Sequence, residues 1–269
     1  MAVVAIGAAL LFGGLSCERA AVAPQGTATL EIYLTDAPSP FREVWIDVEK
    51  IMVTVSSDSP SDSGWMEVPL TRAGAYNLSG FTHGQDTLVA SQKLPQGSIS
   101  EMRLLLGGDN YLVMNDGSVA GLSLPSSVKD GMDIPVQAKL GPSGTVRLVL
   151  DIDAAASVIS TPSGYQLSPS VRTYEKGSAG ELEGVVVPDS VVAGIRAIAG
   201  SDTTVTLPDS TGYFLFTGLR PGSYQVIFGV DSASGYRGDT LFNAGVEAAR
   251  RLTLDTVWLP PAGDSLDIR

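Results

Sequence analysis

The chain of 269 residues contains one cysteine and one histidine, Cys17 and His83. A disulfide within the chain is therefore impossible, and so is a zinc site built from cysteine and histidine alone. Basic residues are also few, because 17 Lys and Arg stand against 29 Asp and Glu, a net charge of −12. Nucleic-acid-binding proteins carry a basic patch, and none is visible. We therefore expect no nucleic-acid partner.

The sequence also lacks an obvious membrane-spanning run in its first residues. Residues 3–12 are apolar, but they are too few to cross a bilayer, which takes about 20 residues. Their length suits the hydrophobic part of a signal peptide, and small residues and then Cys17 follow. This order resembles a bacterial lipobox, in which the cysteine is acylated after cleavage. The alternative is an ordinary secretory signal that is removed together with Cys17.

These features predict an exported protein. We expect residues 1–17 to be a signal peptide, lipid attachment at Cys17, and a tether over residues 18–26. Several acyl chains on one cysteine would hold the protein durably in a membrane. The expected location is the outer membrane or the cell surface.

No long segment has the helical period of apolar residues. Apolar residues instead alternate with polar ones, or form short runs between turn-forming residues such as the 30 glycines and 16 prolines. In 44–55 the apolar face shifts by one residue after Val48, which predicts a β-bulge. Residues 115–118 (NDGS) predict a hairpin turn, and residues 154–159 predict one helical turn. The strands predicted in the first part of the chain are 29–35, 44–55, 102–106, 111–114 and 146–153.

The remainder of the chain repeats the all-β pattern after a segment of linker composition at 175–181. Seven short strands at this spacing are typical of a sandwich. We therefore predict an all-β fold with two β-sandwich domains in tandem, over 27–174 and 182–260, and a tail over 261–269. The strands predicted here are 182–187, 194–198, 203–207, 213–217, 224–228, 239–242 and 251–258.

Two segments resemble known families. Residues 182–260 resemble the carboxypeptidase regulatory-like domain, a transthyretin-like sandwich, through the segments 184–186 (GVV), 209–214 (DSTGYF) and 218–224 (GLRPGSY). This resemblance implies a structural or interaction module in which Leu219 fills the core, and it implies no catalysis.

Residues 27–174 resemble an uncharacterised domain of secreted bacterial and archaeal lipoproteins. The residues that carry the resemblance are Leu34-Thr35-Asp36-Ala37-Pro38, 44–48 (VWIDV), 76–78 (YNL), 94–97 (LPQG), 150–154 (LDIDA) and 167–169 (LSP). The family has no established activity, so the resemblance implies location and architecture alone.

Catalytic signatures are missing from the chain. His83 is the one possible histidine base, and its turn-like surroundings predict an exposed side chain. No serine lies in a Gly-x-Ser-x-Gly context, and there is no phosphate-binding loop. The glycines at 107–110 connect two predicted strands and are typical of a turn. We therefore expect no enzyme, although a carboxylate-based glycan hydrolase is a remote alternative.

Four carboxylates are candidates for a metal site. Asp151 and Asp153 stand two residues apart on a predicted strand and so project from one face, while Asp36 and Asp47 lie at or near strand ends. If these strands converge, the carboxylates offer the oxygen ligands that Ca²⁺ prefers. The alternative is an acidic, solvated face. We expect no cofactor other than possible calcium.

An Asp-Ser/Thr pair followed by a small or apolar residue or Thr occurs more often than composition predicts. The pattern resembles the O-glycosylation signal of one group of Gram-negative bacteria, and its alternative explanation is turn formation. The acceptor residues would be Thr87, Ser190, Thr203, Ser210, Ser232, Thr240, Thr256 and Ser265.

These observations predict a non-catalytic, lipid-anchored module of the cell envelope that binds or scaffolds an unknown protein or glycan. The alternative is a structural subunit of a surface fibre, that is, a pilin-like lipoprotein precursor whose subunits join by strand exchange.

Overall fold

The computed structural model describes residues 26–56 and 64–263. Cys17, the predicted signal peptide, most of the tether and Ser265 lie outside the described residues. The described part is built almost entirely of strands, which confirms the all-β fold class. No helix in this part is long and apolar enough to cross a membrane.

The strands up to residue 175 form two sheets, which we call the first sandwich. One sheet has the order β13-β10-β1-β5, and the other has the order β11-β12-β8-β7-β2-β6-β9, with β3 and β4 also paired to β2. The bounds are β1 (Thr27–Thr35), β2 (Glu43–Ser56), β3 (Trp65–Val68), β4 (Gly74–Asn77), β5 (Thr87–Pro95), β6 (Gly97–Leu106), β7 (Tyr111–Val113), β8 (Val119–Ser123), β9 (Met132–Leu140), β10 (Thr145–Asp153), β11 (Val158–Thr161), β12 (Gly164–Leu167) and β13 (Ser170–Glu175), with the short helices η2 (Leu78–Phe81) and α1 (Ala154–Ser157).

The remaining strands form a second, smaller sandwich. Its sheets have the orders β17-β14-β20, with β21 also paired to β14, and β16-β15-β18-β19. The bounds are β14 (Gly180–Val187), η3 (Asp189–Val191), β15 (Val192–Ala199), β16 (Asp202–Thr206), β17 (Tyr213–Leu219), β18 (Gly222–Val230), β19 (Asp239–Val246), β20 (Arg251–Thr253) and β21 (Val257–Trp258).

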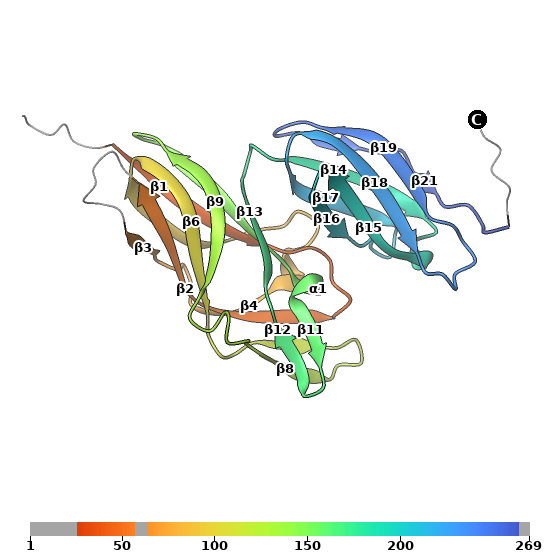
Figure 1. The fold of residues 1–269 in the computed structure, drawn as a ribbon, viewed down its shortest axis with the longest axis horizontal. Helices are drawn as coiled ribbons and strands as arrows, with labels where there is room; N and C mark the ends of the chain where they lie inside the picture. Colours follow the sequence, from red (N-terminus) through yellow and green to blue (C-terminus); the bar gives the residue numbers. More distant parts are fainter. Residues whose placement is uncertain (1–25, 57–63, 264–269) are drawn as a thin grey trace, which may run out of the picture.

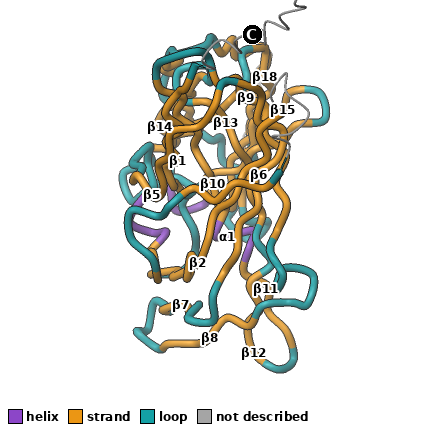
Figure 2. Tube along the Cα trace, turned by 90° about the vertical axis from the view of Figure 1, so that its left-hand side faces the viewer, coloured by secondary structure: helices purple, strands orange, loops and turns teal. Residues whose placement is uncertain are grey.

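The buried apolar residues fall into two separate clusters, one in each sandwich. The two bodies follow one another along the long axis of the molecule (Figure 1), and β7, β8, β11 and β12 extend from the end of the first sandwich (Figure 2). The predicted linker at 175–181 spans the last residue of β13, a tight turn and the start of β14.

Several local predictions are confirmed. In β2 the register against β6 shifts between Val48 and Lys50, which is the expected bulge. The turn between β7 and β8 has Gly117 at φ 85° and Asp116 accepting the N–H of Ser118 at 2.9 Å. The helical turn after β10 is α1, and Leu219 is 2 % exposed in the second core.

One predicted strand is wrong. Residues 251–258 do not form a single strand, because the chain leaves the sheet after Thr253 and returns at Val257. Both pieces pair with β14 in parallel, the first with residues 181–183 and the second with residues 186–187. The intervening residues hold an exposed aspartate and threonine, and alternation alone did not reveal this interruption.

Candidate functional site

The two sandwiches meet where β13 faces β16 and β17, a region that we call the seam. Arg172 on β13 is the side chain that joins them. Its Nη2 atom lies 2.6 Å from Asp151 Oδ2 in the first sandwich. Nη1 donates to Thr204 Oγ1 at 3.0 Å, and Nη2 donates to the carbonyl of Thr217 at 2.9 Å, both in the second sandwich. One side chain therefore has partners on three strands.

Asp151 reaches Arg172 through strand register, because antiparallel pairing of β10 and β13 places the two residues directly opposite each other. Asp151 is 3 % exposed, and this burial raises the pKa of its carboxyl, whereas the Arg172 guanidinium opposes that rise. A buried carboxylate needs such a partner, since an unpaired charge away from water is costly.

Asp36 joins the same cluster from β1. Parallel pairing of β1 with β10 places Thr35 opposite Asp151, so the next residue enters the seam. Asp36 Oδ1 accepts the N–H of Ala154, the first residue of α1, at 2.9 Å. Burial, with smaller contributions from the charges of Asp151 and Asp153, raises the pKa of Asp36 to about 8. The carboxyl is therefore largely protonated at neutral pH.

The other two predicted metal ligands have separate structural roles. Asp153 Oδ1 accepts the N–H of Ala156 at 2.9 Å and so caps α1. Asp47 lies on β2, and its Oδ2 accepts the N–H of Asp109 at 3.3 Å in the turn between β6 and β7. The structure thus brings three of the four candidate carboxylates to the seam and leaves Asp47 in a different turn.

Within the described ranges, no group of three or more histidine, cysteine or acidic residues has the geometry to hold a metal ion. Each seam carboxylate has at least one protein partner, and a guanidinium already supplies positive charge there. The geometry therefore adds no support to the calcium prediction.

Tyr174 makes a second contact across the seam. Burial is the main cause that raises the pKa of its hydroxyl to about 12. Its ring packs on Gly218 of β17, where an added Cβ would lie 2.3 Å from a ring carbon. Gly218 also has φ +67°, a backbone conformation that favours glycine. The close approach of β13 and β17 thus depends on that residue.

His83 and Lys176 make further contacts at the periphery of the seam. His83 is exposed, as predicted, and its ring stacks on Tyr213 of the second sandwich with centroids 6.1 Å apart. Lys176, just after β13, places Nζ 2.5 Å from Asp86 Oδ2 and 4.9 Å from the centre of the Tyr33 ring. The Lys176 contacts hold the turn between the sandwiches against the first sandwich, and the His83 ring is a further contact with the second.

Sequence reasoning missed Arg172, Tyr174, Thr204 and Thr217. A buried aspartate on a central strand implies a cationic partner, but alternation in residues 146–153 places Asp151 on the polar face, so the sequence did not indicate its burial. The partner could not be chosen either, because the register of β13 and the contacts with the second sandwich are long-range features.

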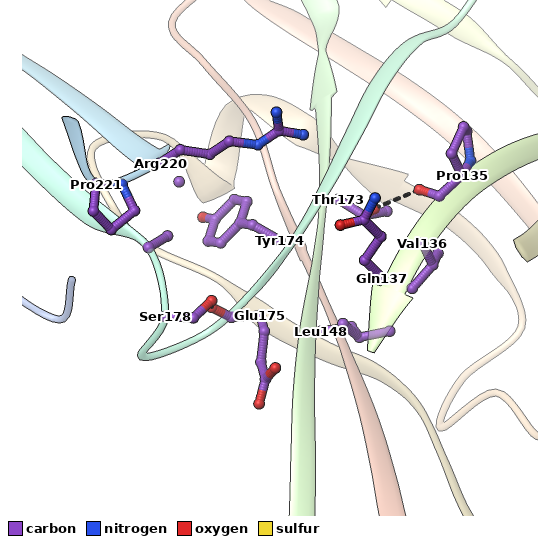
Figure 3. A pocket seen from close by; sticks show the side chains of 12 residues that line it. Pro135, Val136, Gln137, Leu148, Thr173, Tyr174, Glu175, Ser178, Arg220 and Pro221 are labelled. Carbon is purple, nitrogen blue, oxygen red and sulfur yellow. Dashed lines mark hydrogen bonds between the residues drawn. The ribbon is translucent and has the colours of Figure 1, made fainter. Parts of the chain in front are cut away.

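Three pockets follow β13 along its length, and each has the second sandwich as its other wall. The first, of about 200 Å³, is lined by residues 170–172 of β13. The second, of about 300 Å³, is lined by residues 172–173, and the third, of about 360 Å³, by residues 173–175. In the largest, Tyr174 lies on the side of Arg220 and Pro221, and Thr173 lies on the side of Pro135, whose carbonyl accepts from the Thr173 hydroxyl at 2.9 Å (Figure 3). We call the three together the β13 groove.

Strand edges that have no partner strand among the described residues border this groove. β13 and β16 are both end strands of their sheets. Lys176 N donates to Arg147 O, in register with the pairing of β13 and β10. Every second residue of an edge strand makes such bonds, so residues 171 and 173 direct their main-chain groups away from β10. Val205 on β16 is 41 % exposed beside the groove. The groove therefore offers main-chain donors and acceptors to a ligand.

The predicted glycan acceptors are distributed mainly over the second sandwich, and none of those in the described part is buried. At two of the preceding aspartates the turn explanation holds, because Asp209 Oδ1 accepts the N–H of Thr211 and Asp231 Oδ1 accepts the N–H of Ala233, each at 2.8 Å. Modification stays a prediction. The exposed acceptors are Ser190, Thr203, Ser210, Ser232 and Thr256, and the half-buried ones are Thr87 and Thr240.

Comparison with protein families shows that the chain belongs to DUF4382, a domain of unknown function, whose model matches residues 27–169. The match covers most of the first sandwich and agrees with the expected uncharacterised domain over 27–174. The resemblance of the second sandwich to the carboxypeptidase regulatory-like domain stays a prediction. No curated protein matches the chain.

Solved structures similar to this chain include pilins. The shaft pilin SpaA from Lactobacillus rhamnosus GG is 12 % identical, with 90 % of this chain and 100 % of that chain covered and a TM-score of 0.26. GBS52, the minor pilin of Streptococcus agalactiae, is 13 % identical, with 91 % of this chain and 100 % of that chain covered and a TM-score of 0.22. The Bacillus anthracis TIE protein is 8 % identical, with 87 % of this chain and 41 % of that chain covered and a TM-score of 0.25. Scores this low carry no argument about function.

Proposed function

We propose that this chain is a non-catalytic module of the cell envelope, exported and lipid-anchored through Cys17, that binds an extended segment of another polypeptide in the β13 groove. The observation that carries the proposal is that β13 and β16, each an end strand of its sheet in the described part, border the row of pockets along β13. An extended segment is the ligand whose main-chain groups match a free strand edge.

The charges around the groove favour recognition through the main chain. Arg172 is paired with Asp151, and Arg220 Nη1 lies 3.1 Å from Asp202 Oδ2, so the main cations are already neutralised by neighbours. β13 has six residues, which gives an edge of roughly 20 Å at 3.3 Å per residue. An uncharged segment of about six residues fits this edge.

A catalytic role finds no support in the carboxylates. Asp36 and Asp151 are 5 % and 3 % exposed, so their oxygens do not reach a sugar bound at the surface. Glycosidases need two accessible carboxyl groups that flank the bond to be cleaved. The absence of product release from envelope polysaccharides is the expected result.

The binding proposal is tested with a library of ten-residue peptides and the variant Thr173→Pro. Proline removes an N–H that faces the groove, and an edge strand tolerates proline at such a position. The matched control Thr173→Val loses the hydroxyl contact with Pro135 but keeps the N–H. We expect peptide affinity to fall at least tenfold in Thr173→Pro and to change little in Thr173→Val. Equal binding by both variants, or saturable binding to a glycan array instead, would overturn the proposal.

A fibre subunit is the second candidate, in which the bound segment belongs to another copy of the chain. Phe242 on β19 and Trp258 on β21 are 69 % and 70 % exposed, the highest values among large apolar side chains in the described part. Exposed aromatic residues favour association. A fibre subunit gives ladders on gels of unboiled samples that collapse on boiling, and Thr173→Pro removes them. A monomer that binds foreign peptides supports the first candidate.

The anchor is tested by intact mass and membrane partition of the protein from its native cells, beside Cys17→Ser. We expect an acylated mature chain that begins at Cys17, and a soluble chain in the variant. Added hexose mass would support glycosylation of the exposed acceptors. An unmodified chain that is cut elsewhere contradicts lipid anchoring and leaves the groove proposal untouched.

A further inference from the structure

Two buried side-chain oxygens at the seam have no hydrogen-bond partner among the described residues. They are Oδ2 of Asp36, which is 5 % exposed, and Oγ1 of Thr206, which is 2 % exposed. Buried polar atoms in native proteins are nearly always hydrogen-bonded, to protein or to ordered water. Two such atoms in one region therefore point to a ligand that the protein chain itself does not supply.

Both residues line the same small cavity, which lies between the sandwiches. Asp36 and Ala37 form its wall in the first sandwich, and Thr206 and residues 215–217 form its wall in the second. Its volume is about 10 Å³. A cavity of roughly this size has room for one water molecule.

The protonation state of Asp36 determines whether the ligand accepts or donates the hydrogen bond between them. Asp151 and Asp153 lie near Asp36 on β10. Arg172 on β13 and His83, in the turn before β5, line the cavity. Burial and the two acidic neighbours keep Asp36 largely protonated at neutral pH. Its Oδ1 accepts the N–H of Ala154 and its Oδ2 has no partner, so Oδ2 is the oxygen placed to donate a hydrogen to a ligand.

We infer that the cavity is a binding site for one water molecule, which bridges the carboxyl of Asp36 in the first sandwich to the hydroxyl of Thr206 in the second. Water accepts a hydrogen bond from the acid and exchanges one with the hydroxyl, so both orphan oxygens are satisfied. The site thus links the two sandwiches beside Arg172, whatever the β13 groove binds.

A bound cation fits the site less well. Metal cations such as calcium take six or more oxygen ligands, and the guanidinium of Arg172 already occupies the position beside Asp151. A protonated acid is also a poor ligand for a cation. A cation is therefore the competing outcome of the test.

The test compares Thr206→Val, which removes the hydroxyl at constant volume, with Thr206→Ser, which keeps it. A crystal structure of the parent chain should show one density peak within hydrogen-bond distance of Asp36 Oδ2 and Thr206 Oγ1, and that peak should be absent in Thr206→Val. In solution the unfolding midpoint should fall by several degrees in Thr206→Val and stay near that of the parent in Thr206→Ser. Equal midpoints for both variants contradict the inference.

Salt identity distinguishes water from a cation. The midpoint of the parent should be the same in sodium, potassium and choline chloride at equal ionic strength. A midpoint that depends on the cation, or a peak with contacts near 2.4 Å to several oxygens, overturns the assignment to water. A cavity without density in the parent structure overturns it as well.

Discussion

The two sandwiches place their buried polar groups very differently. Five of the six buried polar residues of the described part lie in the first sandwich, namely Thr35, Asp36, Asn110, Asp151 and Ser157, and the second has Thr206 alone. The second core instead contains Phe214, Phe216 and Phe228, which pack edge to face at 5.5–6.2 Å between ring centres. The first sandwich thus supplies charged groups to the seam, while the second presents a hydroxyl, a carbonyl and a glycine.

This asymmetry indicates how the two sandwiches are held together at the seam. The carboxylates of the first sandwich are satisfied largely within that sandwich, and Arg172 is the group that extends to the other side. The first sandwich should therefore depend on Arg172 for its own stability, whereas the second should depend mainly on close packing at Gly218.

The largest expected effect tests the first half of this comparison. Arg172→Ala leaves Asp151 buried without its partner and removes both hydrogen bonds to the second sandwich. We expect the free energy of unfolding to fall by about 3–5 kcal/mol, measured by urea denaturation. The control is Arg147→Ala, which breaks a 3.0 Å ion pair with Glu31 at an exposed site and should cost less than about 1 kcal/mol. Equal effects would show that Asp151 does not need Arg172.

Gly218→Ala tests the second half. The new Cβ would collide with the Tyr174 ring, and the residue would be held at φ +67°. We expect a loss of roughly 2–3 kcal/mol in unfolding free energy, since steric overlap and backbone strain add. Gly235→Ala separates the two causes, because it has φ +74° and nothing within 4 Å of its Cβ. That control should lose about 1 kcal/mol, and a matching loss at both positions would remove the packing argument.

Much of the first sandwich can be predicted from its sequence, whereas the partners that meet at the seam cannot. The alternation in β10 places Asp151 and Asp153, and the pairing of β1 with β10 brings Asp36 to them, as convergence of the predicted strands required. The partner of Asp151 lies 21 residues further along the chain and depends on strand register. Thr204 and Thr217 reach the seam only through the placement of a second folded body, which no local pattern encodes.

Asp36 allows the smallest and most specific test of the asymmetry, because its pKa is raised to about 8 from an ordinary value near 4. The folded state therefore holds a proton that the unfolded state releases between these values. The stability that this proton provides is complete below about pH 4 and is lost as the pH rises toward 8. Asp36→Asn cannot ionise and keeps an oxygen for the N–H of Ala154. Its unfolding free energy should gain on that of the parent by at most ~1.4 kcal/mol per pH unit across this window.

Urea denaturation of both proteins at each pH from 4 to 9 measures this difference directly. The acids outside the seam titrate alike in both chains, so their contributions cancel in the comparison. A difference that stays constant from pH 4 to 8 would show that Asp36 is ionised in the folded protein. The seam would then hold a further negative charge near Arg172, and the water bridge between Asp36 and Thr206 would lose the donor on which it depends.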